Sequence, residues 1–288
     1  MKMQKVWFIT GASRGFGLEI AKAALAAGDQ VVATVRSQPT QLAATLDNHP
    51  ELYVVQMDVI QEDQVQAAVR QGIACFGRLD VLVNNAGYGM VTAIEEATDA
   101  EVRKQYDTNV FGLLNVTRAV LPYLRQQKSG HIINISSLFG YDAIPGWGLY
   151  GSTKFAVEGI SKGLAAELAP LGIHVTVVAP GLFTTDFLST DSYVAAKTLI
   201  ADYQETVGQM RMGADALHGN QPGDPKKFAQ VILQLANTEH PPLHLPVGKD
   251  AVAMYQGNAA KMAQEIEAWL PVATSTDHDH PIAASTVA

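Results

Sequence analysis

The 288-residue sequence contains one cysteine, Cys75, so no intrachain disulfide can form and nothing points to an oxidising compartment. Cys75 falls in an amphipathic segment, and we expect it to be a small packing residue because free cysteines are usually buried. The sequence also lacks an apolar run of about 18 residues, which a membrane-spanning helix needs. Residues 1–5 lead into an apolar segment without the features of a signal peptide. The sequence therefore predicts a cytoplasmic protein.

Basic residues are few, because 20 Lys and Arg stand against 28 Asp and Glu, a formal net charge of -8. An acidic surface repels phosphate backbones, so a nucleic-acid partner is not expected. Residues 272–288 are rich in Ser, Thr and Ala, and we expect them to form a flexible tail. This segment contains Asp277-His278-Asp279-His280, but no further cluster of ligands accompanies it, and we predict no metal site.

Short Val- and Ile-rich runs alternate with longer segments of helical periodicity. Runs that are apolar on both faces are typical of parallel strands covered by helices on both sides of a sheet. The pattern predicts a single-domain Rossmann fold over residues 1–271, with a doubly wound, seven-stranded parallel sheet. Residues 184–223 are too long for a simple connection and are a candidate substrate lid. The expected strands are residues 6–10, 30–35, 52–56, 81–84, 131–136, 173–179 and 243–247, and the main expected helices are 15–27, 62–76, 99–127, 150–168 and 225–235.

A glycine-rich turn, Thr10-Gly11-Ala12-Ser13-Arg14-Gly15-Phe16-Gly17, joins the first expected strand to the first expected helix. Glycines allow the backbone to approach a pyrophosphate, and a helix N-terminus offers free N–H groups and a positive dipole. Such a turn is informative here because it follows a strand and opens a helix. The sequence therefore predicts a dinucleotide site at this turn.

The spacing of this turn, T-G-x-x-x-G-x-G, is followed in order by Asn84-Asn85-Ala86-Gly87, Asn109, Ser137, Tyr150-x-x-x-Lys154 and Pro180-Gly181. With these motifs, residues 6 to about 250 resemble the short-chain dehydrogenase/reductase family. A weaker similarity, at Val35-Arg36 and residues 243–247, is to its hydroxysteroid/retinol dehydrogenase branch. The resemblance implies hydride transfer between a nicotinamide cofactor and a carbonyl/alcohol pair. It also implies a homodimer or homotetramer that associates through residues 99–127 and 150–168.

Tyr150 and Lys154 are four residues apart, so on a helix they lie one turn apart on one face. One cation at ~4 Å, with an effective dielectric of ~20, supplies about 4 kcal/mol, enough to lower a phenol pKa by about three. We therefore expect Lys154, helped by oxidised nicotinamide, to account for most of the shift that makes Tyr150 an acid/base at neutral pH. The resemblance implies that Ser137 orients the substrate oxygen and that Asn109 holds a water linked to Lys154. Ser136 is the alternative to Ser137, on the opposite face of the strand.

The cofactor is predicted to be NADP(H), because Val35 and Arg36 stand where NAD enzymes place an acid at the end of the second strand. Arg36 and Arg14 suit a 2′-phosphate. Asp58-Val59 matches the family position that contacts adenine, although Asp58 also suits a helix N-cap. The family loop that holds the nicotinamide carboxamide corresponds to Pro180-Gly181 with Thr185, or alternatively Thr184. The full expected cofactor set is Gly11, Ser13, Arg14, Gly15, Phe16, Gly17, Arg36, Asp58, Val59, Asn85, Ala86, Gly87, Tyr150, Lys154, Pro180, Gly181 and Thr185.

The side chains expected beside the nicotinamide are mostly apolar or aromatic, and several could equally be core residues. They favour a hydrophobic ketone or secondary alcohol as substrate. Three alternatives remain: a non-catalytic NADP-binding regulator, a beta-oxoacyl carrier-protein reductase, and a sugar-nucleotide epimerase or dehydratase. The acidic surface disfavours the second, because a carrier protein is itself acidic. The expected substrate residues are Tyr88, Phe139, Tyr141, Ile144, Trp147, Phe183 and Phe187, with Leu138 as a further wall.

Overall fold

The computed structural model describes residues 4–188, 193–195 and 198–278. Its centre is a seven-stranded sheet in the order β3-β2-β1-β4-β6-β7-β9, and every neighbouring pair is parallel. The predicted fold class is therefore confirmed, with each expected strand found to within one residue at either end. The strands are β1 (Val6–Ile9), β2 (Gln30–Val35), β3 (Leu52–Gln56), β4 (Val81–Asn84), β6 (Gly130–Ile135), β7 (Ile173–Pro180) and β9 (His244–Val247).

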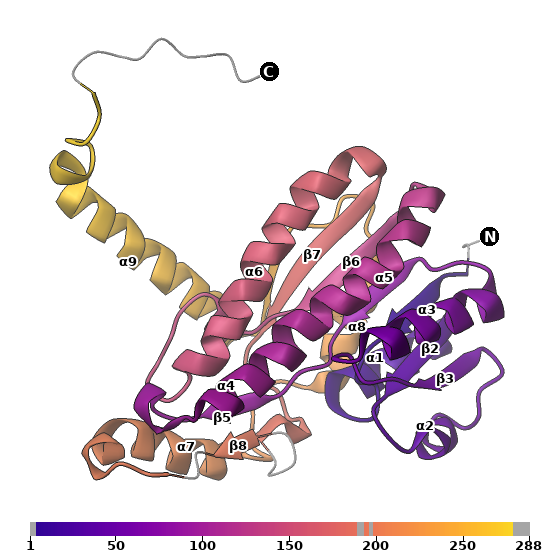
Figure 1. Cartoon of the computed structure of the whole chain (residues 1–288), viewed down its shortest axis with the longest axis horizontal. Coiled ribbons are helices and arrows are strands. Elements are labelled where there is room, and N and C mark those ends of the chain that lie inside the picture. The colour runs from indigo at the N-terminus through magenta and orange to yellow at the C-terminus, as the bar shows by residue number, and fades with distance from the viewer. Residues whose placement is uncertain (1–3, 189–192, 196–197, 279–288) are drawn as a thin grey trace.

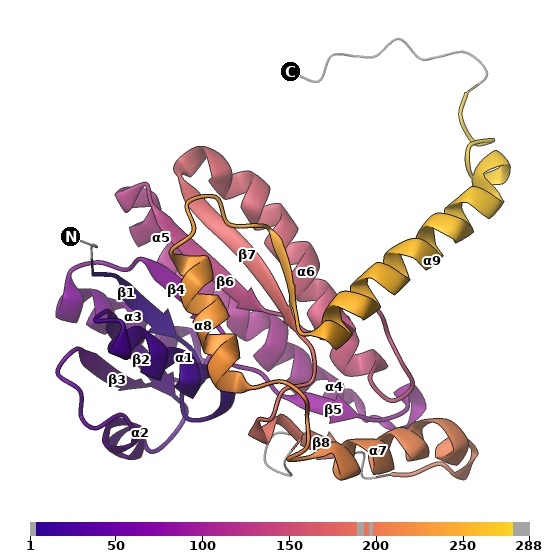
Figure 2. The same cartoon turned by 180° about the vertical axis from the view of Figure 1, so that it is seen from behind.

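Helices cover both faces of this sheet (Figures 1 and 2). Strand alternation sends Trp7 and Ile9 into a core with α1 (Gly15–Ala26) and α8 (Pro225–Ala236), and Phe8 into the opposite core with α3 (Glu62–Phe76) and α5 (Gly112–Gln127). These three side chains of β1 are fully buried. The remaining helices are α2 (Pro39–Thr45), α4 (Asp99–Tyr106), α6 (Gly148–Leu168), α7 (Gln209–Leu217) and α9 (Lys249–Ala273).

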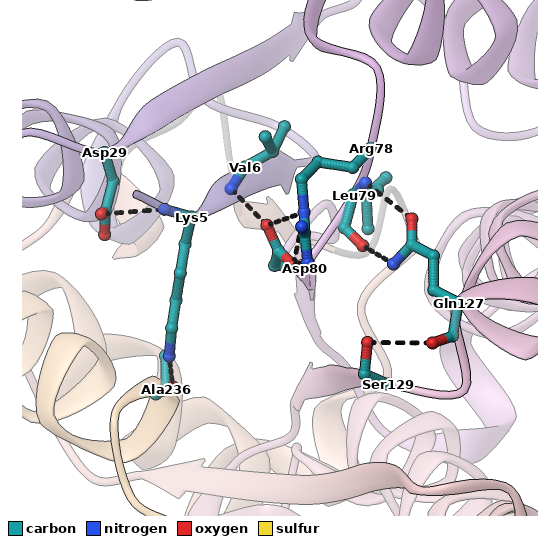
Figure 3. Close-up of polar contacts among 9 residues, drawn as sticks. All are labelled: Lys5, Val6, Asp29, Arg78, Leu79, Asp80, Gln127, Ser129 and Ala236. Atoms are coloured by element: carbon teal, nitrogen blue, oxygen red, sulfur yellow. Dashed lines mark hydrogen bonds and ion pairs between the residues drawn. The ribbon is translucent and has the colours of Figure 1, made fainter. Parts of the chain in front are cut away.

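Two buried carboxylates fasten the amino-terminal edge of the sheet (Figure 3). Asp80 accepts a hydrogen bond from the Val6 N–H at 2.9 Å and is paired with Arg78 at 2.6 Å. Asp29 accepts from the Lys5 N–H at 3.1 Å. These bonds satisfy groups at the start of the strands, so they stabilise the edge opposite the one at which parallel sheets bind ligands.

Two expectations about helices are corrected by the structure. The helix expected over residues 99–127 is divided by a π-helical turn, η2 (Asp107–Phe111), and Asn109 lies within that turn. A single π-turn inside an α-helix often marks a functional site. The packing role expected for Cys75 is wrong, because Cys75 lies on the exposed side of α3.

The segment expected to form a lid contributes β8 (Tyr193–Ala195) to a second, two-stranded parallel sheet, in which it pairs with β5 (Gly89–Val91). Glu96, in the short helix η1 (Ile94–Glu96), is buried, accepts from the Ile200 N–H at 3.0 Å and is paired with Arg211 of α7. The Glu96–Arg211 ion pair thus joins residues 184–223 to the rest of the structure. Residues 189–192 and 196–197 of the lid lie outside the described residues. Its other elements are η5 (Asp186–Leu188), η6 (Ala201–Tyr203) and η7 (Gln204–Gly208).

Helix α9 extends away from the body of the molecule (Figures 1 and 2). It continues to Ala273, two residues into the segment expected to be a tail, and from residue 259 every described residue is exposed. Asp279 and His280 of the Asp/His run lie outside the described residues. Within the described ranges, no helix is both long enough and apolar enough to cross a membrane.

Candidate active site

A cavity of about 1000 Å³ opens along the carboxyl edge of the sheet. Its lining includes residues within two positions of the ends of five strands: Gly11 after β1, Arg36 after β2, Asn85 after β4, Ser136 after β6 and Gly181 after β7. The carboxyl ends of parallel strands, near the change in strand order, are where such sheets bind dinucleotides. The cavity therefore has the size and position of a cofactor cleft together with a substrate site.

The glycine turn is built for close backbone approach. Gly11 and Gly15 have positive φ values of 66° and 56°, which side-chain-bearing residues rarely adopt. Gly17 does not line the cavity; it lies in α1, where a Cβ would come within 2.5 Å of the Gly11 carbonyl oxygen. The other predicted turn residues, Ser13, Arg14, Gly15 and Phe16, do line the cavity.

Hydrogen bonds between Thr10 and Asn85 stabilise the glycine turn. The Thr10 hydroxyl oxygen accepts from the N–H groups of Asn85 at 2.9 Å and Ala86 at 3.0 Å. The Asn85 amide donates back to the carbonyl oxygens of Thr10 at 2.9 Å and Gly11 at 3.1 Å. Sequence reasoning did not assign Thr10 a role, although its place directly before Gly11 was a usable signal.

Asn84 joins the central strands to the helices that carry the site. Its side-chain amide donates to Thr117 of α5 at 3.0 Å and to Asn134 of β6 at 2.9 Å. Asn134 in turn donates to Ser161 of α6 at 2.9 Å. All four side chains are buried, so this network fixes α5 and α6 relative to the sheet.

The far end of the cavity is lined by Arg36, Asp58 and Val59. Val35 is buried at the end of β2, so Arg36 is the first residue after this strand to reach the cavity. Asp58 is not a helix N-cap, because Gln61 is the N-cap of α3. Instead, its carboxylate accepts from the Ile60 N–H at 3.2 Å. Arg36 and the Arg14 of the glycine turn therefore both line the cavity.

Tyr150 and Lys154 lie one turn apart in α6, and both are buried in the cavity wall. The Tyr150 hydroxyl is hydrogen-bonded to Ser137, which lies two residues after β6. The Lys154 ammonium donates to the Ile135 carbonyl oxygen at 2.9 Å and lies 5.7 Å from the centre of the Tyr150 ring. The structure thus brings together the three side chains that the sequence indicated.

The pKa values of this pair differ from the sequence-based expectation. Burial raises the pKa of Tyr150, and the hydrogen bond from Ser137, rather than the charge of Lys154, is the opposing influence. Burial lowers the pKa of Lys154 to about 8, and the negative charge of Glu158 partly opposes this. The expectation failed because it counted the attraction between the two groups without the cost of removing both from water. Burial therefore favours the protonated form of the Tyr150 phenol.

Asn109 lies behind the pair and does not line the cavity. Its side-chain oxygen accepts from the Tyr88 N–H at 3.1 Å, and its side-chain nitrogen donates to the Tyr88 carbonyl at 3.0 Å and to Thr153 at 3.1 Å. A Cβ placed on Gly87 would lie 3.1 Å from Asn109 and 3.8 Å from the Lys154 ammonium, so the two side chains are neighbours. Asn109 therefore joins the segment after β4 to α6 at the site.

The loop after β7 distinguishes the two candidate threonines. The Thr184 hydroxyl donates to the Gln221 carbonyl oxygen at 2.7 Å, whereas Thr185 lines the cavity facing Gly15. This placement favours Thr185. Asp250, from the first turn of α9, accepts from the Leu182 N–H at 2.6 Å and fixes the loop. No local pattern identifies Asp250, because it reaches this loop only through the fold.

An aromatic wall surrounds Tyr150. Its ring centre lies 5.7 Å from that of Trp147, 6.3 Å from Phe139 and 5.5 Å from Phe187. Phe183 also reaches the cavity, but it packs mainly between Phe16 and Phe228, so it is largely a core residue. Tyr88 and Leu138 complete the predicted wall.

Two residues expected to contact substrate do not line the cavity: Tyr141 and Ile144. Tyr141 lies on the other side of the turn that follows Ser137, with its ring centre 4.3 Å from that of Tyr255. Ile144 packs beside the aromatic cluster without reaching the cavity. The sequence could not tell which side of the turn each residue faces.

Comparison with known proteins agrees with this geometry. A family model described as short chain dehydrogenase matches residues 5–193. Oxidoreductase BOA17 of Botryotinia fuckeliana is 43% identical over 262 residues, which are 90% of this chain and 94% of that protein. A short-chain dehydrogenase from Streptomyces avermitilis aligns with a TM-score of 0.89 at 39% identity, covering 96% of this chain and 100% of that one. ElxO with NADP bound aligns with a TM-score of 0.72 at 29% identity, covering 87% and 100%. The chain therefore belongs to the short-chain dehydrogenase family and is an oxidoreductase.

Proposed function

We propose that this protein is an NADPH-dependent reductase of hydrophobic ketones, with Tyr150 as the proton donor. The observation that carries the proposal is that Tyr150, Ser137 and Lys154 meet in one cavity that also contains the glycine turn. The cavity has room for both a dinucleotide and a substrate.

The cavity fits a phosphorylated nicotinamide dinucleotide. At the glycine turn, a Cβ on Gly11 would lie 3.0 Å from the Ala86 backbone, so the space depends on glycine. The N-terminus of α1 suits the pyrophosphate, and Arg14 and Arg36 suit a 2′-phosphate. NADP is bound in ElxO. When bound, NADPH supplies the hydride.

The residues of the chain supply the proton and the orientation. A protonated Tyr150 donates to the substrate oxygen while Ser137 holds that oxygen in place. Lys154 uses one of its three N–H groups on the Ile135 carbonyl, which leaves two that can hold the ribose. The wall of Phe139, Trp147 and Phe187 excludes water and favours an apolar substrate.

The test measures NADPH oxidation by purified protein against aryl, aliphatic, steroid and acyl-thioester ketones. We expect turnover of an apolar ketone, and a loss of about 100-fold or more in Tyr150→Phe, because general acid catalysis typically contributes that much. Tyr150→Phe should still bind NADPH. Stoichiometric NADPH binding without turnover of any ketone would instead support a regulatory protein.

Cofactor choice is tested separately with Arg36→Asp. We expect this change to shift the preference from NADPH towards NADH by about tenfold or more, because it removes a charge-assisted contact and adds a repulsive charge. An unchanged preference would show that Arg36 does not read the 2′-phosphate.

A further inference from the structure

Helix α6 carries a third buried ionisable side chain, and the proposed reaction does not use it. Tyr150, Lys154 and Glu158 follow one another at intervals of one turn, so they share one face of the helix. Glu158 is only 4% exposed. A buried carboxylate is costly unless something around it compensates its charge.

The surroundings of Glu158 come from several elements. Its carboxylate lies 3.3 Å from the ring nitrogen Nδ1 of His244 and packs near the hydroxyls of Ser136 and Tyr141, while neither carboxylate oxygen makes a hydrogen bond to the described residues. The Tyr141 hydroxyl lies 3.3 Å from the same His244 nitrogen. The titratable or hydrogen-bonding groups of this cluster are Lys154 and Lys162 on α6, Ser136 at the end of β6, Tyr141 after the turn η3 (Leu138–Gly140), His244 on β9 and, beyond Tyr141, Tyr255 on α9.

This cluster holds the turn that presents Ser137. Ser136 immediately precedes Ser137, and Tyr141 lies at the other end of η3. Gly140 packs so tightly there that a Cβ would come within 2.6 Å of the Ser136 oxygen and 3.3 Å of a Glu158 oxygen. Contacts with Glu158 therefore flank Ser137 on both sides along the chain.

Glu158 also faces Lys154 along the helix. The buried Lys154 ammonium has an Ile135 carbonyl as its hydrogen-bond acceptor, and Glu158 is the carboxylate that opposes the effect of burial on its pKa. Burial raises the pKa of Glu158 itself, and the neighbouring hydroxyls and the charges of Lys162 and Lys154 oppose that rise. The ionised carboxylate favours the protonated form of Lys154.

We propose that Glu158 is a positioning residue of the active site, whose carboxylate fixes the turn that carries Ser137 and balances the charge of Lys154. The inference rests on the proposed reductase function, because it assigns Glu158 a part in that same site. Shape and charge can be separated by substitution: Glu158→Gln keeps the shape and removes the charge, whereas Glu158→Ala removes both.

The first experiment compares wild type, Glu158→Gln and Glu158→Ala, with Glu167→Gln as the matched control from an exposed position of α6. It measures kcat and KM for the ketone, and the Kd of NADPH by fluorescence, across a range of pH. Removing a nearby negative charge makes Lys154 release its proton more readily. In Glu158→Gln, the alkaline limb of kcat/KM for reduction should therefore move to lower pH by about one unit.

In Glu158→Ala we expect kcat/KM for the ketone to fall by about tenfold or more, because small misplacements of a substrate-orienting group are costly. NADPH affinity should change little, and Glu158→Gln should recover most of the loss. If Glu158→Gln has the wild-type pH profile, the charge role is overturned. If Glu158→Ala keeps wild-type KM and kcat at every pH, the positioning role is overturned. If Glu158→Ala does not fold, the same result for Glu158→Gln overturns it.

A second readout does not require turnover. The pKa of Lys154, followed by NMR of isotopically labelled lysine, should lie near 8 in the wild type and lower in Glu158→Gln. An unchanged value overturns the inference whatever the substrate. If no ketone is reduced while this pKa moves as expected, the proposed function fails and the coupling of Glu158 to Lys154 stands.

Discussion

Replacing Lys154 by methionine should abolish ketone reduction and yet stabilise the cofactor-free protein at neutral pH. The ammonium is buried, and burial lowers its pKa from the ordinary 10.5 to about 8. Methionine has a similar length and no charge, so the substitution removes a buried cation without opening a large cavity. We therefore expect burial of the charged Lys154 to lower the free energy of unfolding, and we expect no such loss with methionine at this position.

The size of this cost follows from the two pKa values. Below pH 8 the lysine is protonated in both folded and unfolded chains, and the difference between 10.5 and about 8 corresponds to about 3 kcal/mol of lost stability. As the pH rises from about 8 to 10.5, the folded protein releases the proton first and the cost disappears. Methionine leaves the Ile135 carbonyl without its donor, which costs about 1–2 kcal/mol. The net gain for Lys154→Met at pH 7 is therefore about 1–2 kcal/mol.

Urea unfolding of the cofactor-free protein at pH 7 and near pH 10.5 measures this difference. Lys227→Met, at an exposed position of α8, is the matched control and should change stability little at either pH. The reasoning is refuted if Lys154→Met is less stable than the wild type at pH 7. It is also refuted if the difference between the two proteins is the same at both pH values.

Two further substitutions test the framework of the site. Asn134→Ala removes the acceptor for Asn84 and the donor to Ser161. Because each buried partner then lacks one hydrogen bond, the free energy of unfolding should fall by about 2–4 kcal/mol. A urea midpoint equal to that of the wild type would contradict this prediction. Asp250→Ala leaves the Leu182 N–H without its acceptor. Fluorescence titration should show several-fold weaker NADPH binding, and urea unfolding should show little change in the free energy of unfolding. Unchanged NADPH binding would show that the loop after β7 needs no support from α9.

The sheet and the position of its ligand site were predictable because they depend on local and periodic signals. Each strand is an apolar run ended by turn residues, and a parallel arrangement follows from the helices between them. The motif residues that follow the strands must then meet at one edge. Tyr150 and Lys154 share a face through their spacing on a helix, whereas Ser137 was preferred to Ser136 because of its match to the family motif, and both serines line the cavity.

The supports of the site were not predictable, because they arrive from distant parts of the chain. Asp250 reaches the loop after β7 from α9, and His244 reaches Glu158 from β9. Tyr141 was misplaced for a related reason: it follows Ser137 closely, but the tight packing of Gly140 against Ser136 turns the chain so that Tyr141 faces away from the cavity. Periodicity predicts which face of a regular element is buried, and it gives no such rule for a short turn.

The sequence-based estimate for Tyr150 treated two charges at a fixed separation, which only favours the ionised phenol. Burial is the largest influence on both residues and acts in the opposite sense on the phenol, while it also weakens the cation that was expected to help. A fold that buries the acid and its cation together therefore keeps the proton on Tyr150 until a further positive charge enters the cavity. That arrangement suits donation to a ketone, whereas the charge of Glu158, one turn beyond Lys154, acts on the pKa of Lys154.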